Sequence, residues 1–135
     1  MASSQEIPEG WRLIEVDRAF SFSAPESVRA QDAQVVDSLA ATLSDERIEI
    51  LYDYGWYSSP LTEYDDQLVS SSNDTLDGRP ARFIETENLV AVHVPTVVDQ
   101  TGFTMVVRFA NPEHRDLGRA VIASVRFESQ QIGPQ

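Results

Sequence analysis

The chain has 135 residues, of which 41% are hydrophobic, so it has the size of one domain with a proper hydrophobic core. It carries 22 acidic and 10 basic residues, and the formal net charge of -12 repels nucleic-acid phosphates and anionic lipid headgroups. Every basic residue is arginine and cysteine is absent, which excludes lysine Schiff bases, disulfides, thiol nucleophiles and thiolate metal sites. The charge either keeps the domain soluble or attracts a basic protein partner.

The two ends of the chain are expected to lie outside the folded domain. Residues 1–10 lack the basic and apolar regions of a signal peptide, and we expect them to be disordered or left over from expression. Residues 129–135 are expected to form a flexible tail, which leaves a single domain over residues 11–128. The longest apolar stretch, Leu89–Val98, is too short to insert into a membrane. Both a cytoplasmic location and export after removal of a signal remain open.

Most of the domain is predicted to form strands. Alternation of apolar and polar residues is clearest where Ile48, Ile50, Tyr52 and Tyr54 share one face. Leu89–Val94 is apolar on both faces apart from one histidine, as in a central strand that is covered on both sides. A turn is predicted at Asp77-Gly78-Arg79-Pro80. Further strands are expected at Trp11–Val16, Phe20–Ser23, Ala81–Glu87, Phe103–Phe109 and Val125–Phe127.

One helix is predicted near the C-terminus. Asn111 can cap it, Pro112 suits the first helical position, and Glu113 suits the positive end of the helix dipole. The residues at helical spacing that should face the sheet are Leu117, Ala120, Val121 and Ser124. The fold class is therefore α+β, with an antiparallel sheet, a C-terminal helix and a short last strand.

The segment from Ser27 to Asp45 fits two interpretations. Its alanine content and the spacing of its apolar residues favour a helix. A strand over Val36–Leu43, followed by a tight turn at Ser44-Asp45, would instead pair with Ile48–Tyr54 as a hairpin. The residues alone lean toward the helix.

The most unusual stretch is rich in both aromatic and acidic residues. Five of the six tyrosine and tryptophan side chains, together with four carboxylates, lie between Tyr52 and Asp66. Aromatic side chains with a polar group often anchor partners, although they also dominate cores. If binding is the function, the candidate site lies between Trp56 and Asp66, with aromatic anchors and a charged rim. Its residues are Trp56, Tyr57, Glu63, Tyr64, Asp65 and Asp66.

Catalytic and metal-binding motifs are not apparent in the sequence. Glu63, Asp65 and Asp66 could seat calcium but lack the spacing of an EF-hand loop. His93 and His114 are too few for a zinc site, and no nucleophile elbow, phosphate loop or dinucleotide fingerprint occurs. No cofactor or metal is therefore expected. The enzymatic alternative is a small hydrolase that uses His93 with a nearby carboxylate.

The order of four short motifs resembles the PsbP-like fold family. The motifs are Phe20–Pro25, Tyr52–Ser58, Leu76–Ala81 and Ala123–Phe127, and the resemblance spans Trp11 to Glu128. It is strongest to small bacterial members of unknown function. The family also includes the extrinsic PsbP protein of photosystem II, a Ran-binding nuclear import factor, and chaperones for type VI secretion effectors.

The resemblance implies an antiparallel sheet flanked by helices and a binding or assembly role without catalytic residues. It also implies that a strand beginning near Asp37 precedes the Ile48–Tyr54 strand, and we therefore predict the hairpin rather than the helix. The favoured function is a non-catalytic module that binds a basic or apolar protein surface. A chaperone-like adaptor for a secreted protein and the His93 hydrolase are the alternatives.

Overall fold

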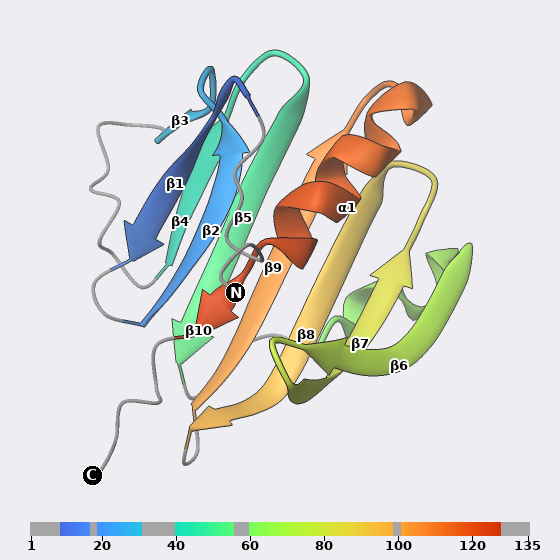
Figure 1. Ribbon diagram of the computed structural model, residues 1–135. Coiled ribbons are helices and arrows are strands. Elements are labelled where there is room, and N and C mark those ends of the chain that lie inside the picture. The colour runs from blue at the N-terminus through green and yellow to red at the C-terminus, as the bar shows by residue number, and fades with distance from the viewer. Residues whose placement is uncertain (1–8, 17–18, 31–39, 56–59, 99–100, 128–135) are drawn as a thin grey trace, which may run out of the picture.

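The computed structural model describes residues 9–16, 19–30, 40–55, 60–98 and 101–127 (Figure 1). The expectations for residues 1–10 and 129–135 fall almost entirely outside these ranges. The elements follow one another in this order: β1 (Trp11–Val16), β2 (Phe20–Pro25), β3 (Arg29–Ala30), β4 (Ala40–Ser44), β5 (Ile48–Gly55), the 3-10 helix η3 (Thr62–Gln67), β6 (Ser70–Leu76), β7 (Arg79–Glu85), β8 (Leu89–Val98), β9 (Thr101–Phe109), the 3-10 turn η4 (Pro112–His114), α1 (Arg115–Ala123) and β10 (Arg126–Phe127).

The strands form two antiparallel sheets. The larger has seven strands in the order β3-β4-β5-β9-β8-β7-β6, and the smaller has three in the order β1-β2-β10. The small sheet and α1 cover the same face of the large sheet, here called the front face, while η3 lies on the opposite, back face (Figure 1). The expected α+β class, with a C-terminal helix and a short last strand, is confirmed.

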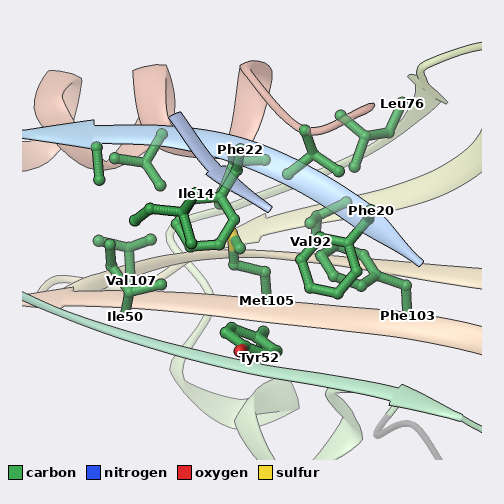
Figure 2. Close-up of a cluster of buried hydrophobic side chains, with 14 of the residues drawn as sticks. Ile14, Phe20, Phe22, Ile50, Tyr52, Leu76, Val92, Phe103, Met105 and Val107 are labelled. Carbon is green, nitrogen blue, oxygen red and sulfur yellow. The ribbon is translucent and has the colours of Figure 1, made fainter. Parts of the chain in front are cut away.

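The main core lies between the front face and the layer that covers it. Phe20 of β2 is fully buried, and its ring centroid lies 4.7 Å from that of Phe103 and 5.1 Å from that of Tyr52. Figure 2 shows how these rings and the aliphatic side chains of β8 and β9 fill the space between β2 and the large sheet. The two-residue periodicity predicted for β5 and β9 therefore sets which side chains enter this core.

The hairpin prediction for the ambiguous segment is confirmed over the described residues. β4 pairs with β5 from Ala40↔Asp53 to Ser44↔Glu49, whereas residues 36–39 lie outside the description. Asp45 organises the turn, because its Oδ1 accepts hydrogen bonds from the backbone N–H groups of Arg47 and Ile48 at 2.7 and 3.0 Å. Pairing with a central strand thus outweighs the helix propensity of the alanines.

Asn111 caps the 3-10 turn that leads into the C-terminal helix rather than α1 itself, whose N-cap residue, His114, makes no side-chain capping hydrogen bond. Asn111 Oδ1 accepts a hydrogen bond from Glu113 N at 3.0 Å, and Pro112 opens a 3-10 turn that leads into α1. The inward face, however, was predicted incorrectly in part, because Ala120 is exposed. Gly118 is buried and brings α1 close to the sheet, so the buried face of the helix differs from the predicted one. The side chains that pack inward are Leu117, Val121 and Ile122.

Candidate functional site

The back face of the sheet carries the described part of the sequence-predicted site. Glu63, Tyr64, Asp65 and Asp66 all belong to η3, and the three carboxylates are exposed while Tyr64 is half-buried. Trp56 and Tyr57 lie outside the described residues. The four described residues of the predicted site therefore lie in a short 3-10 helix rather than in an irregular loop.

A second hydrophobic cluster fixes η3 to the sheet. Leu61 precedes η3 in the left-handed conformation, with φ 69°, which costs a leucine on the order of 1–2 kcal/mol. Its side chain is only 1% exposed, and this burial sustains the strained backbone. Tyr64 and Leu68 pack against the same cluster. Its buried members are Leu61, Ile84, Leu89, Ala91 and Val106.

Two arginines of the sheet hold the polar side of η3. Arg82 of β7 donates from a terminal nitrogen to Asp65 Oδ1 at 3.1 Å, and Arg108 of β9 donates to the Tyr64 hydroxyl at 3.2 Å. Arg108 also lies 3.6 Å from a Glu49 carboxylate oxygen. The side chains of Tyr64 and Asp65 therefore hold η3 against the sheet. The exposed carboxylates of η3 are attached to this anchored segment.

His93 belongs to a row of polar residues that crosses the back face beside η3. The strand registers place Asp53, Thr104, His93 and Arg82 next to one another on β5, β9, β8 and β7. His93 Nδ1 lies 3.2 Å from Thr104 Oγ1. Burial lowers the pKa of His93, and the nearby positive charge of Arg82 lowers it further. A hydrogen bond with the Phe103 backbone opposes both effects without cancelling them.

Among the residues that the structure describes, no carboxylate stands beside His93 as the hydrolase hypothesis requires. Asp53 lies two strands away from His93, which corresponds to about 10 Å between their backbones. The carboxylate of Asp65 is engaged by Arg82. Among the described residues, no carboxylate is positioned to orient His93 as the acidic member of a triad would.

A cleft on the front face was not predicted from the sequence. It has a volume of about 410 Å³ and lies between α1 and the β6–β7 hairpin. Leu76, Phe83 and Ile122 contribute its apolar surface. On one wall, Glu85 accepts hydrogen bonds from Arg119 Nε at 2.7 Å and from a terminal nitrogen of Arg119 at 2.8 Å. No local pattern predicts this cleft, because its lining combines residues 72–91 with residues 119–123 of α1.

The described part of the chain also shows no candidate metal site and no candidate membrane-spanning helix. No group of three or more histidine, aspartate or glutamate side chains there is placed to hold a metal ion. None of the helices in the same ranges is long and apolar enough to cross a bilayer.

Comparisons with known proteins identify the fold. No family model and no curated protein matches the sequence. Among solved structures, the chain is similar to the solution structure of cyanobacterial PsbP (CyanoP) from Synechocystis sp. PCC 6803. The TM-score is 0.62 at 10% sequence identity, and the match covers 89% of this chain and 94% of that one. The chain therefore has the PsbP-like fold, as the order of its motifs suggested.

Proposed function

We propose that the protein is a non-catalytic module that binds a basic protein partner through the η3 surface. This surface consists of Glu63, Tyr64, Asp65 and Asp66 of η3. Trp56 and Tyr57 are added to the proposed site from the sequence alone. The observation that carries the proposal is the fixed presentation of exposed acids on η3. Arg82, Arg108 and the buried Leu61 anchor η3 to the sheet. The η3 segment therefore loses little conformational freedom when a partner binds.

Charge supports a basic partner over an acidic one. The chain has a formal net charge of -12, and Glu63 and Asp66 add exposed negative charge on the back face. Complementary charge of this kind accelerates association and makes it sensitive to salt. The aromatic residues Trp56 and Tyr57, assigned here from the sequence, would supply most of the affinity.

The test compares two double variants with the same change in charge. Glu63→Gln with Asp66→Asn removes two charges from η3, and Glu15→Gln with Glu46→Gln removes two exposed charges elsewhere. Each protein is used at physiological salt to capture partners from the native host, with quantitative mass spectrometry as the readout. A basic partner that the wild type and the control retain, and the η3 variant loses at least fivefold, is the expected result.

Equal capture by both double variants would show that η3 is not the binding surface. Tyr57→Ala provides a second variant that leaves the charge unchanged. We expect it to weaken capture of the same partner while the thermal unfolding midpoint stays at the wild-type value. Tyr64→Ala is unsuitable for this purpose, because Tyr64 packs in the second hydrophobic cluster.

A further inference from the structure

Strand β6 forms one edge of the large sheet, and no other strand of the described residues pairs with its outer side. It is the last strand in the order β3-β4-β5-β9-β8-β7-β6, and its residues from Ser70 to Thr75 are exposed. Natural edge strands are commonly protected by lysine, proline or a covering element. β6 contains neither lysine nor proline. Val69, directly before it, is 61% exposed and is one of two large hydrophobic side chains that are exposed in the described part of the chain.

The hairpin register identifies which backbone groups of β6 point outward. Asp77 and Gly78 both have positive φ, at 51° and 83°, and form the two-residue turn between Leu76 and Arg79. Hydrogen-bonded and non-hydrogen-bonded pairs alternate from this turn, so the N–H groups of Ser71, Asn73 and Thr75 face away from β7. Thr75 N agrees with this assignment, because it donates to Asp74 Oδ1 at 2.9 Å. Ser71 and Asn73 present the remaining outward groups.

The front-face cleft lies directly beside this edge. Ser72, Asp74 and Leu76 of β6 line it, and α1 closes its far side. In Figure 1, α1 runs over β8 and β9, while the β6–β7 hairpin extends the sheet beyond it. An open edge next to a cleft has the two parts that strand addition requires: main-chain hydrogen bonds for affinity and a pocket for alternate side chains.

From this geometry we infer that β6 and the cleft bind an extended, basic segment of a partner protein by strand addition. Among the acids that line the cleft, Glu85 is paired with Arg115 and Arg119, and Asp77 with Arg79, so Asp74 supplies the negative charge that remains for an occupant. An arginine or lysine of the added strand would lay its aliphatic stem beside Leu76 of β6. Its charged group would reach Asp74.

Charge also distinguishes this occupant from a second copy of the chain. Pairing two β6 strands would bring together two proteins of net charge -12, with Asp74 on both edges. Like charges placed opposite one another on paired strands are destabilising. A basic segment removes this repulsion. The site is separate from η3, which lies on the back face.

The test uses a synthetic acetylated and amidated hexapeptide, (Arg-Val)3, titrated into protein labelled with ¹³C and ¹⁵N. We expect shifts at the amides of Ser71, Asn73 and Thr75 and at the methyl groups of Leu76 and Ile122. The matched peptide (Glu-Val)3 should bind at least tenfold more weakly. Asn73→Pro removes an outward N–H without removing a β6–β7 hydrogen bond and should weaken (Arg-Val)3 binding at least tenfold. Asn73→Ala should stay within threefold of the wild type.

Two N-methylated forms of the peptide keep the inference testable even if Asn73→Pro does not fold. One form carries methyl groups on its arginine amides and the other on its valine amides, so only one form blocks the hydrogen bonds of an added strand. Their affinities should differ at least tenfold. Equal affinities, shifts confined to Glu63–Asp66, or no binding at millimolar peptide would each overturn the inference. Self-association without peptide that Asn73→Pro abolishes would overturn it in favour of a second copy.

Discussion

Gly118 of α1 lies against Val90 of β8 so closely that a Cβ atom at residue 118 would stand 2.9 Å from Val90 Cγ2. The same atom would lie 3.2 Å from Val107 Cγ1. Both valines are buried and β-branched, so their side chains have little freedom to move away. A glycine in the interior of a helix normally weakens it, and here the close approach to the sheet explains its presence.

We predict that Gly118→Ala destabilises the protein, although alanine is the better helix former. Overpacking against Val90 and Val107 should lower the free energy of unfolding by about 1–3 kcal/mol, as measured by urea denaturation. Val90→Ala creates space at the same point. The double variant should therefore be more stable than the sum of the two single changes predicts, with a coupling of about 1 kcal/mol. Additive effects would contradict a direct contact.

Glu85 of β7 joins α1 to the sheet by accepting hydrogen bonds from Arg119 and Arg115, and we predict that this contact stabilises the fold. Hydrogen bonds from Arg119 lower the pKa of Glu85, with a further contribution from Arg115, and together they outweigh the opposing effect of burial. Glu85→Gln should lower the free energy of unfolding by about 1–2 kcal/mol at pH 7. The control, Asp116→Asn, breaks a solvent-exposed pair with Arg119 and should change it by no more than about 0.5 kcal/mol.

The same interaction predicts the sign of a pH effect. Because the folded-state pKa of Glu85 lies below its ordinary value of 4.5, the carboxylate stabilises the folded state above that pH. This stabilisation is lost as the pH falls below 4.5 and through the folded-state pKa. The wild type should consequently lose more stability than Glu85→Gln between pH 6 and pH 3. Parallel pH profiles would show that the ion pair contributes nothing.

Asp45 is predicted to determine the stability of the β4–β5 hairpin. Burial acts to raise the pKa of Asp45, but hydrogen bonds from Ser27, Ile48 and Arg47 lower it overall. Asp45→Ala removes all of these acceptors and should cost about 2 kcal/mol in urea denaturation. Asp45→Asn keeps one oxygen for the backbone N–H groups of Arg47 and Ile48 and should cost about half as much. Equal losses would mean that the charge, rather than the turn geometry, matters.

Local patterns in the sequence predict much of the front-face core. The alternation of Ile48, Ile50 and Tyr52 identifies β5 and its buried face, and Asp77-Gly78 identifies a turn that needs positive φ. The Asn111 cap is equally local. Each of these features depends on residues a few positions apart, which is why they can be recognised without a structure.

The back face and the cleft depend on contacts that no local pattern encodes. β6 reads Ser-Ser-Ser-Asn-Asp-Thr-Leu and has almost no apolar residues, so its pairing with β7 is visible only in the register. The hydroxyl of Tyr64 accepts a hydrogen bond from Arg108, which is 44 positions away along the chain. Four of the six residues of the sequence-predicted site have a defined position on η3, and the binding role of all six stays a prediction.

The titration of His93 is predicted to depend on Arg82. Burial and the positive charge of Arg82 place the folded-state pKa of His93 below its ordinary value of 6.5. As the pH falls through 6.5, the unfolded chain therefore takes up a proton before the folded protein does. His93 should make the protein progressively less stable until the pH passes its folded-state pKa. His93→Gln should remove this part of the loss in stability between pH 7.5 and 5.5.

Two variants separate the charge of Arg82 from its ion pair. Arg82→Gln removes the positive charge and should raise the pKa of His93 toward 6.5, as followed by the imidazole resonances in an NMR titration. Asp65→Asn also breaks the Arg82–Asp65 pair, which is 3.1 Å long, but it leaves the arginine charge in place. It should not raise the pKa of His93. If both variants raise it equally, then the position of η3 over the sheet, rather than the charge of Arg82, controls the histidine.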